Sequence, residues 1–262
     1  CDLPVAYQVR NFNRKNLDLI AANWERIKSA LERAVRLTNR FGISRDNLTS
    51  ANALVPVAYF FMQHPDRKLQ GTSQFDSENV SKVHAWVLTS LLNNIFGGQS
   101  DRALTAARQA IKATADDQDD FPIGALVEAL ESIGRRPRFD DVALQDLLET
   151  EYGDWDCFLA LSLLYDNANW GHTPHEQDHI FPKKMFEKKA FADLGWSEER
   201  RQDYLLLRDR VGNLQLLTED ENRSKSGQTF SLWVQTRNEQ FRQTHLIPAD
   251  DELLDFARFE DF

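Results

Sequence analysis

The chain has 262 residues, 42% of them hydrophobic, which is enough apolar material for one large domain or two smaller ones. No apolar run approaches the roughly 18 residues of a membrane-spanning helix, and two cysteines, Cys1 and Cys157, cannot build the disulfide framework of a small secreted domain. We therefore expect a globular protein of the reducing cytoplasm. The formal net charge of -10 disfavours nucleic acid as a partner, but residues 171–245 carry twelve basic and twelve acidic side chains and are neutral.

Helical periodicity dominates residues 1–168. Apolar residues at three- and four-residue spacing from Leu17 to Ala34 predict one long amphipathic helix, with Gly42 as its left-handed terminator. Pro56 predicts a kink or a late start in the next helix. The further helices are expected at residues 50–61, 80–96, 100–115, 122 onward, 142–150 and 155–167. We expect a mainly α protein with a helical scaffold over residues 1–168.

The residues best suited to chemistry come later in the chain. Asp178 and His179 open the short apolar segment Asp-His-Ile-Phe-Pro, which reads as a strand that ends at its proline. A second apolar strand is expected at residues 214–217, directly after Asn213, and the polar run that follows predicts a helix containing Asn222. If the two strands pair as a hairpin, this helix returns toward Asp178, so that two oxygen ligands can hold one divalent cation beside His179.

These segments resemble the His-Me finger nucleases, also called HNH or ββα-metal nucleases. They are most similar to the C-terminal nuclease domain of GmrSD-type, modification-dependent restriction enzymes. The resemblance covers residues 170–241 and, less specifically, residues 23–27 and 41–43. It implies a small α+β nuclease domain over residues 169–262, with His179 as general base, Asp178 and Asn222 as metal ligands, and Asn213 bracing the hairpin around His179.

The chemistry of the residues agrees with this interpretation. A neutral imidazole takes a proton from water at neutral pH, and carboxylate and amide oxygens suit a hard cation such as Mg²⁺, with Mn²⁺ as an alternative. Four neighbouring cations could hold DNA phosphates, or could equally be solvated surface charges: Lys183, Lys184, Arg223 and Lys225. The sequence predicts a metal-dependent DNA endonuclease that nicks or cuts both strands. The resemblance implies a role in defence against foreign or phage DNA.

Two alternatives compete with a nuclease. Residues 175–179 satisfy the His-Glu-x-x-His pattern of zinc metallopeptidases, but that site needs a helix, and Pro174 and Pro182 leave room for about two turns at most. The chain could instead be a helical interaction module that is silent without a partner or a missing domain, and that forms oligomers.

Three further expectations concern the chain's ends and the hairpin connection. In the related enzymes a nucleotide-handling, DNA-sensing domain comes first, and because this chain starts at Cys1 we expect a fragment that lacks it. A polar helix capped by Ser197 is expected between residues 191 and 210, inside the hairpin connection. The last seventeen residues carry six acids and one arginine, and we expect a solvated terminus there, with autoinhibition as the alternative.

Overall fold

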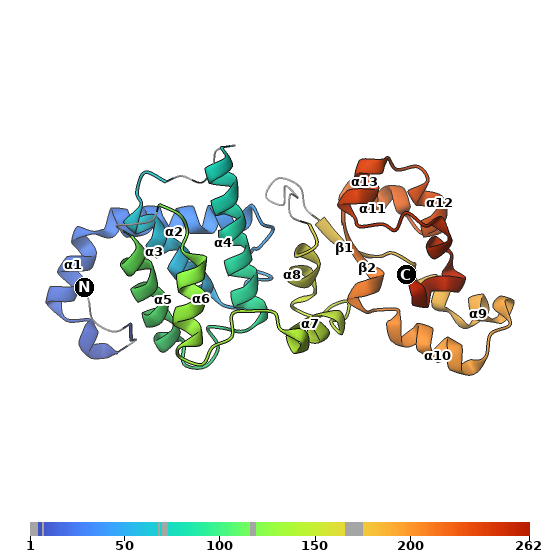
Figure 1. The fold of residues 1–262 in the computed structure, drawn as a ribbon, viewed down its shortest axis with the longest axis horizontal. Helices are drawn as coiled ribbons and strands as arrows, with labels where there is room; N and C mark the ends of the chain where they lie inside the picture. Colours follow the sequence, from blue (N-terminus) through green and yellow to red (C-terminus); the bar gives the residue numbers. More distant parts are fainter. Residues whose placement is uncertain (1–4, 7, 68, 70–72, 116–118, 166–174) are drawn as a thin grey trace. The chain divides into compact units, whose positions relative to one another are not determined.

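The computed structural model describes the chain except for residues 1–4, 7, 68, 70–72, 116–118 and 166–174 (Figure 1). It is mainly helical, with one small two-stranded sheet. The chain divides into two compact units, residues 1–139 and residues 140–262. The boundary expected at 168/169 lies outside the described residues, and the second unit already includes two helices that precede it.

The first unit is a bundle of helices. Its α-helices are α1 (Arg14–Ala22), α2 (Trp24–Asn39), α3 (Leu54–Gln63), α4 (Gln74–Leu92), α5 (Ser100–Thr114) and α6 (Ile123–Glu131), with 3₁₀ turns at Val9–Asn11 and Ala51–Ala53. Phe60, Trp86 and Phe121 are fully buried, and the ring of Phe121 contacts the rings of both Phe60 and Trp86. The indole Nε1 of Trp86 donates a hydrogen bond to the carbonyl oxygen of Ala53 over 3.1 Å, so the polar end of this core residue is satisfied.

The single long helix expected from residue 17 to 34 is wrong, because the helix breaks at Asn23. This residue leaves the helical conformation (φ -109°, ψ 8°) and its side-chain amide donates to the carbonyl of Leu19 over 2.9 Å. Asparagine competes with the helix in this way because its short amide reaches nearby backbone groups. Gly42 adopts the expected left-handed conformation at φ 72°. Pro56 lies in the first turn of α3, which confirms the late start.

The second unit contains both strands. Its elements are α7 (Asp141–Leu148), α8 (Cys157–Ser162), β1 (His175–His179), α9 (Lys188–Leu194), α10 (Glu198–Leu207), β2 (Leu214–Thr218), α11 (Glu219–Lys225), α12 (Phe230–Val234) and α13 (Glu239–Thr244), with 3₁₀ turns at Lys183–Phe186, Val211–Asn213, Asp251–Leu254 and Phe256–Asp261. β1 and β2 pair antiparallel, with His179 opposite Leu214. The polar helix predicted inside the connection is α10, and Ser197 caps it as expected, accepting a hydrogen bond from the backbone N–H of Arg200.

The acidic terminus is part of the core of this unit. Leu254, Phe256 and Phe259 are buried, and the ring of Phe259 lies 5.2 Å from that of Phe181, the residue two beyond the end of β1. The expectation of a solvated terminus is therefore wrong. The phenylalanines between the acids bury large apolar areas, which stabilises the packed terminus. The carboxylates stay at the surface, so this packing does not remove them from water.

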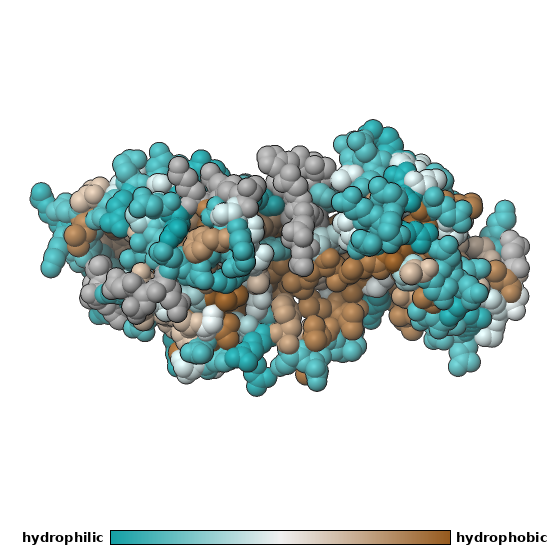
Figure 2. Space-filling model, turned by 45° about the horizontal axis from the view of Figure 1, so that its top comes forward, coloured by the Kyte–Doolittle hydropathy of each residue, from teal (hydrophilic) through white to brown (hydrophobic). Residues whose placement is uncertain are grey.

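The surface mixes polar and apolar side chains, as Figure 2 shows by its teal and brown atoms. Val142 and Leu148 of α7 are among the exposed large apolar residues. Within the described part of the chain, no helix is both long and apolar enough to cross a lipid bilayer. Cys157 is buried, and burial raises the pKa of its thiol to about 12, as expected for a structural cysteine.

Candidate functional site

β1 and β2 pair as a hairpin, and α11 follows β2 without a loop between them (Figure 1). α11 begins at the residue after β2 because Thr218 ends the strand and caps the helix. The Thr218 hydroxyl accepts from the backbone N–H of Glu221 over 3.3 Å, and the Glu221 carboxylate accepts from the backbone N–H of Thr218 over 2.8 Å. This reciprocal pair satisfies two donors at the start of the helix. The predicted order of strand, strand and helix is thus present.

His179 ends β1 with its imidazole in a nearly closed environment. Its side chain is 10% exposed, its Nε2 lies 2.8 Å from Oδ1 of Asp209, and the ring of Tyr152 lies 4.8 Å away. Burial lowers the pKa of His179, although the hydrogen bond that its ring makes to the Asp209 carboxylate opposes this shift. The imidazole is therefore neutral at neutral pH, the state that a general base requires.

Asp209 gathers three donors around one carboxylate. Arg208 donates to Oδ2 through Nε at 2.8 Å, and Lys183 Nζ lies 3.1 Å from Oδ1, the oxygen that also contacts His179. Burial raises the pKa of Asp209, but hydrogen bonds from Arg208, His179 and Lys183 outweigh it and hold the pKa well below the usual range. Asp209 was not predicted from the sequence. Its only local signal is an acid between two arginines, shortly before the Gly-Asn pair that precedes β2.

Asn213 joins the two sides of the hairpin connection. Its side chain is buried; Oδ1 accepts from the backbone N–H of Phe181 over 2.8 Å, and Nδ2 donates to the carbonyls of Phe181 over 3.2 Å and Arg208 over 2.7 Å. The amide therefore links the residues after β1 to those before β2. Asn213 thus lies where a residue that stabilises the hairpin around His179 is expected. The effect of Asn213 on activity stays a prediction.

Asp178 points away from His179, because successive side chains of a strand alternate between its faces. Its Oδ2 accepts from Gln215 Nε2 over 2.9 Å and from Lys225 Nζ over 2.5 Å. Lys225 also donates to the carbonyl of His179, and its side chain is only 3% exposed. Burial lowers the pKa of this lysine, while Asp178 opposes the shift. Lys225 was expected at the surface as a phosphate-binding residue, but it is engaged inside the hairpin, because a poorly exposed carboxylate needs a cationic partner.

Asn222 is half-buried on α11, and its Nδ2 donates to Oε2 of Glu176 over 2.5 Å. Glu176 and Asp178 are two residues apart on β1 and so share one face of the strand. The structure thus pairs Asn222 with Glu176, a residue absent from the predicted ligand set. No cluster of three or more His, Cys, Asp or Glu side chains able to hold a metal occurs in the described part of the chain. The oxygens of Asp178, Glu176 and Asn222 are nevertheless of the type that a hard divalent cation prefers.

Comparison with known proteins gives one result for this region. Residues 138–259 match the family model of the C-terminal domain of GmrSD restriction endonucleases. Over these residues the chain is similar to that domain. The match spans nearly the whole second unit, including β1, β2 and α11. It confirms the resemblance inferred from the motifs and makes the domain one of restriction-endonuclease type. No curated protein matches the chain.

The other predicted phosphate-binding residues lie at the surface of the second unit. Lys183 is half exposed, and its ammonium lies 4.6 Å from the centre of the Tyr152 ring. Lys184 donates to the carbonyl of Gly227. Arg223 is exposed on α11 and pairs with Glu219 over 2.5 Å. Of these three cations, Lys183 is the one whose contacts join it to the surroundings of His179.

The strand conformation of residues 175–179 excludes the zinc metallopeptidase alternative. That site requires two histidines one helical turn apart on one side of a helix, whereas here His175 and His179 stand at opposite ends of an extended strand. At about 3.3 Å per residue their α-carbons are about 13 Å apart, which is too far for both imidazoles to hold one zinc ion in tetrahedral geometry.

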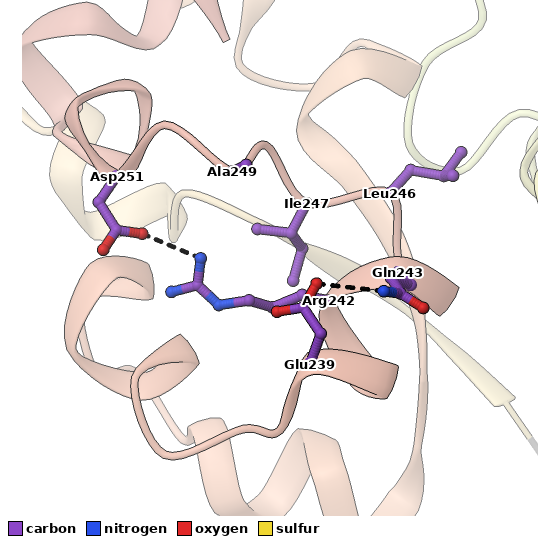
Figure 3. A pocket seen from close by; sticks show the side chains of 7 residues that line it. All are labelled: Glu239, Arg242, Gln243, Leu246, Ile247, Ala249 and Asp251. Atoms are coloured by element: carbon purple, nitrogen blue, oxygen red, sulfur yellow. Dashed lines mark hydrogen bonds and ion pairs between the residues drawn. The ribbon is translucent and has the colours of Figure 1, made fainter.

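A surface pocket of the second unit lies at α13 and the segment after it (Figure 3). An ion pair of 2.9 Å between Arg242 and Asp251 crosses it, and Gln243 donates to Glu239 over 3.2 Å. Its lining contains none of the predicted site residues: Glu239, Arg242, Gln243, Leu246, Ile247, Ala249 and Asp251. The polar groups of the pocket are thus engaged with one another, and the hairpin remains the candidate site.

Proposed function

We propose that the GmrSD C-terminal domain of this chain is a divalent-metal-dependent DNA endonuclease with His179 as its general base. The observation that carries the proposal is the nearly buried imidazole of His179, held 2.8 Å from the carboxylate of Asp209 at the end of β1 in a ββα unit. The family match supports a nuclease activity.

The residues around His179 suit hydrolysis of a phosphodiester. The neutral imidazole takes a proton from a water molecule, and the oxygen of that water bonds to phosphorus. The bond from phosphorus to the departing sugar oxygen breaks, and this oxygen takes a proton from solvent. Lys183, half exposed beside Asp209, supplies positive charge close to the path of the phosphate. The carboxylate of Asp209 stabilises the imidazolium that forms on His179.

The proposed nuclease also needs a divalent cation. Its oxygen donors lie on the face of β1 opposite His179. Asp178 and Asn222 are the residues proposed to hold it, with Mg²⁺ as the expected ion and Mn²⁺ as a substitute. Glu176 is a third oxygen donor on the same side, because it already contacts Asn222. When bound, such an ion neutralises charge on the phosphate oxygens and on the departing oxygen. Lys225 already provides one positive charge at Asp178.

The biological setting proposed for this activity is defence against foreign or phage DNA. A nucleotide-handling domain that senses DNA is the proposed partner, either in the same protein or as a separate chain. The exposed apolar residues Val142 and Leu148 of α7 provide a surface on which another domain or a second copy could pack.

The proposal predicts that His179→Ala abolishes DNA cleavage while the protein stays folded. The assay follows supercoiled plasmid to open-circular and linear forms with Mg²⁺ or Mn²⁺, and with EDTA in place of the metal. Loss of the general base should lower the rate at least about 100-fold. The matched control is His175→Ala at the other end of β1, which should retain activity within about threefold.

Each outcome of this assay decides a part of the proposal. Cleavage that needs metal and disappears in His179→Ala supports it, and a reaction that stops at open circles makes the enzyme a nickase. Full activity of His179→Ala contradicts the assignment of the base. Unchanged cleavage in EDTA contradicts the requirement for a divalent metal. The absence of any cleavage by the wild-type chain favours a catalytically silent interaction module.

A further inference from the structure

Asp209 is thirty residues from His179 in sequence, yet its carboxylate contacts the imidazole directly. The Oδ1 oxygen of Asp209 lies 2.8 Å from Nε2 of His179, and the two side chains are 21% and 10% exposed. A hydrogen bond shielded from water in this way restricts the rotation of the ring. Tyr152 packs against the same imidazole at 4.8 Å and limits its movement further.

The backbone around Asp209 is anchored from two directions. Its carbonyl accepts from the backbone N–H of Tyr152 over 2.7 Å, and the carbonyl of Arg208 accepts from the side chain of Asn213 over 2.7 Å. Next to it, the N–H of Val211 donates to Thr150 over 2.9 Å. The carboxylate is therefore presented to His179 by a segment with little freedom to move, as a positioning residue requires.

The charge partners of Asp209 keep it an acceptor. Arg208 contacts Oδ2 through both Nε at 2.8 Å and Nη2 at 2.5 Å, and Lys183 contacts Oδ1 at 3.1 Å. These two cations stabilise the ionised carboxylate, which has no proton to donate. The proton in the hydrogen bond between Asp209 and His179 must then belong to Nε2 of the imidazole.

We propose that Asp209 is the positioning residue of this site: it holds the proton of His179 on Nε2 and leaves Nδ1 as the nitrogen that receives the proton of water. In a neutral imidazole one nitrogen donates and the other accepts, so the partner of Nε2 decides which nitrogen can act as a base. After the transfer Nδ1 carries the proton of the attacking water, and the imidazolium lies beside a carboxylate that stabilises it. The step rests on the proposed function, because it describes the same base.

The first test reads the tautomer directly and requires no cleavage. Long-range ¹H–¹⁵N spectra of the full chain, with its six histidines labelled and His179 assigned by comparison with His179→Gln, distinguish Nε2–H from Nδ1–H. We expect the Nε2–H form in the wild-type chain and a mixture of both forms in Asp209→Ala. A predominant Nδ1–H form in the wild type, or an unchanged pattern in Asp209→Ala, would overturn the proposal.

The second test separates positioning from binding by steady-state cleavage of plasmid DNA. Asp209→Ala should lower kcat about 100-fold, because a misplaced catalytic group costs about this factor, while KM changes by less than about threefold. The matched control is Asp203→Ala, which removes the same charge from an exposed position on α10 and should leave both constants unchanged. A kcat in Asp209→Ala equal to that of the control would overturn the proposal.

A near-isosteric variant covers the case in which Asp209→Ala fails to fold. Asp209→Asn retains an oxygen that accepts from Nε2–H but loses the charge, so we expect the Nε2–H form to persist with kcat lowered about tenfold. An unchanged kcat in a folded Asp209→Asn protein would overturn the proposal. If the wild-type chain does not cleave DNA at all, the proposed function fails, and the tautomer spectra still decide whether Asp209 positions His179.

Discussion

Adjacent residues of β1 belong to two separate charge clusters. Asp178 contacts Lys225 and Gln215 on one face of the strand, and His179 contacts Asp209 on the other. The alternation of a strand keeps the two clusters apart although their residues are neighbours. At the residue scale, therefore, a proposed metal-side carboxylate and a proposed base can be tuned independently, each by its own cationic partners.

Lys225 provides a prediction at this scale. Lys225→Met removes the ammonium that contacts Asp178 and the carbonyl of His179, so a largely buried carboxylate loses its cation. We expect the free energy of unfolding to fall by about 1–3 kcal/mol, measured by urea denaturation at pH 7. The control is Arg223→Met, which removes an exposed ion pair with Glu219 and should cost less than about 1 kcal/mol. Equally small losses in both variants would show that Lys225 is a surface cation after all.

At the scale of elements, Tyr165 connects three of them. It follows α8, its hydroxyl accepts from the backbone N–H of Leu216 in β2 over 3.2 Å, and it lies 3.1 Å from Nδ1 of His245 at the end of α13. The ring of Phe241 stacks on His245 at 4.0 Å. A neutral imidazole accepts from the tyrosine hydroxyl, whereas a protonated one cannot. The junction of these elements therefore depends on an uncharged His245.

His245 makes the stability of this junction depend on pH. Burial lowers its pKa to about 4 in the folded protein, whereas the unfolded chain has a pKa near about 6.5. Between these values the unfolded chain binds a proton that the folded chain does not, so stability is lost as the pH falls. The loss from this group between pH 8 and pH 5 is about 2 kcal/mol. We expect urea denaturation of His245→Phe to show a pH dependence smaller by about this amount; parallel curves for variant and wild type would contradict the assignment.

At the scale of the whole molecule, each unit has its own core. The second unit buries a cluster of aromatic and aliphatic residues drawn from the segment after β1, from α10, from α12 and from the C-terminal turns. Phe181, Tyr204, Trp233 and Phe259 are members of it, and all lie within residues 140–262. A core complete within one segment of the chain is the physical condition for independent folding.

The chain should therefore yield a folded domain when residues 140–262 are produced alone. We expect a single cooperative urea transition, with tryptophan fluorescence and far-ultraviolet circular dichroism giving the same midpoint. A gradual, non-cooperative change would contradict the independence of this unit. A shorter piece that ends at residue 249 lacks Leu254, Phe256 and Phe259 and should lose the transition, because their removal opens the core.

Much of the hairpin could be read from local sequence. The short apolar segment that begins at Asp178, the proline that follows it and the Gly-Asn pair before Leu214 predict two short strands. β2 lies where it was predicted, whereas β1 overlaps its predicted strand only at Asp178 and His179 and ends three residues before Pro182. The cap of α10 at Ser197 was equally visible, because a hydroxyl satisfies the first turn of a helix from one residue away. Signals of this kind involve residues close together in sequence.

Other features were decided only by the tertiary structure. The contact of Asp209 with His179 spans thirty residues, that of Lys225 with Asp178 spans 47, and the acidic terminus packs its phenylalanines around Phe181. None of these has a periodic or capping signal, because each depends on how the chain returns after α10, α11 and α13. The sequence by itself determined the helical class, the strand pair and the identity of the proposed base. The partners that neutralise, orient and bury these residues were decided by packing, since a charge finds its partner in space and not along the chain.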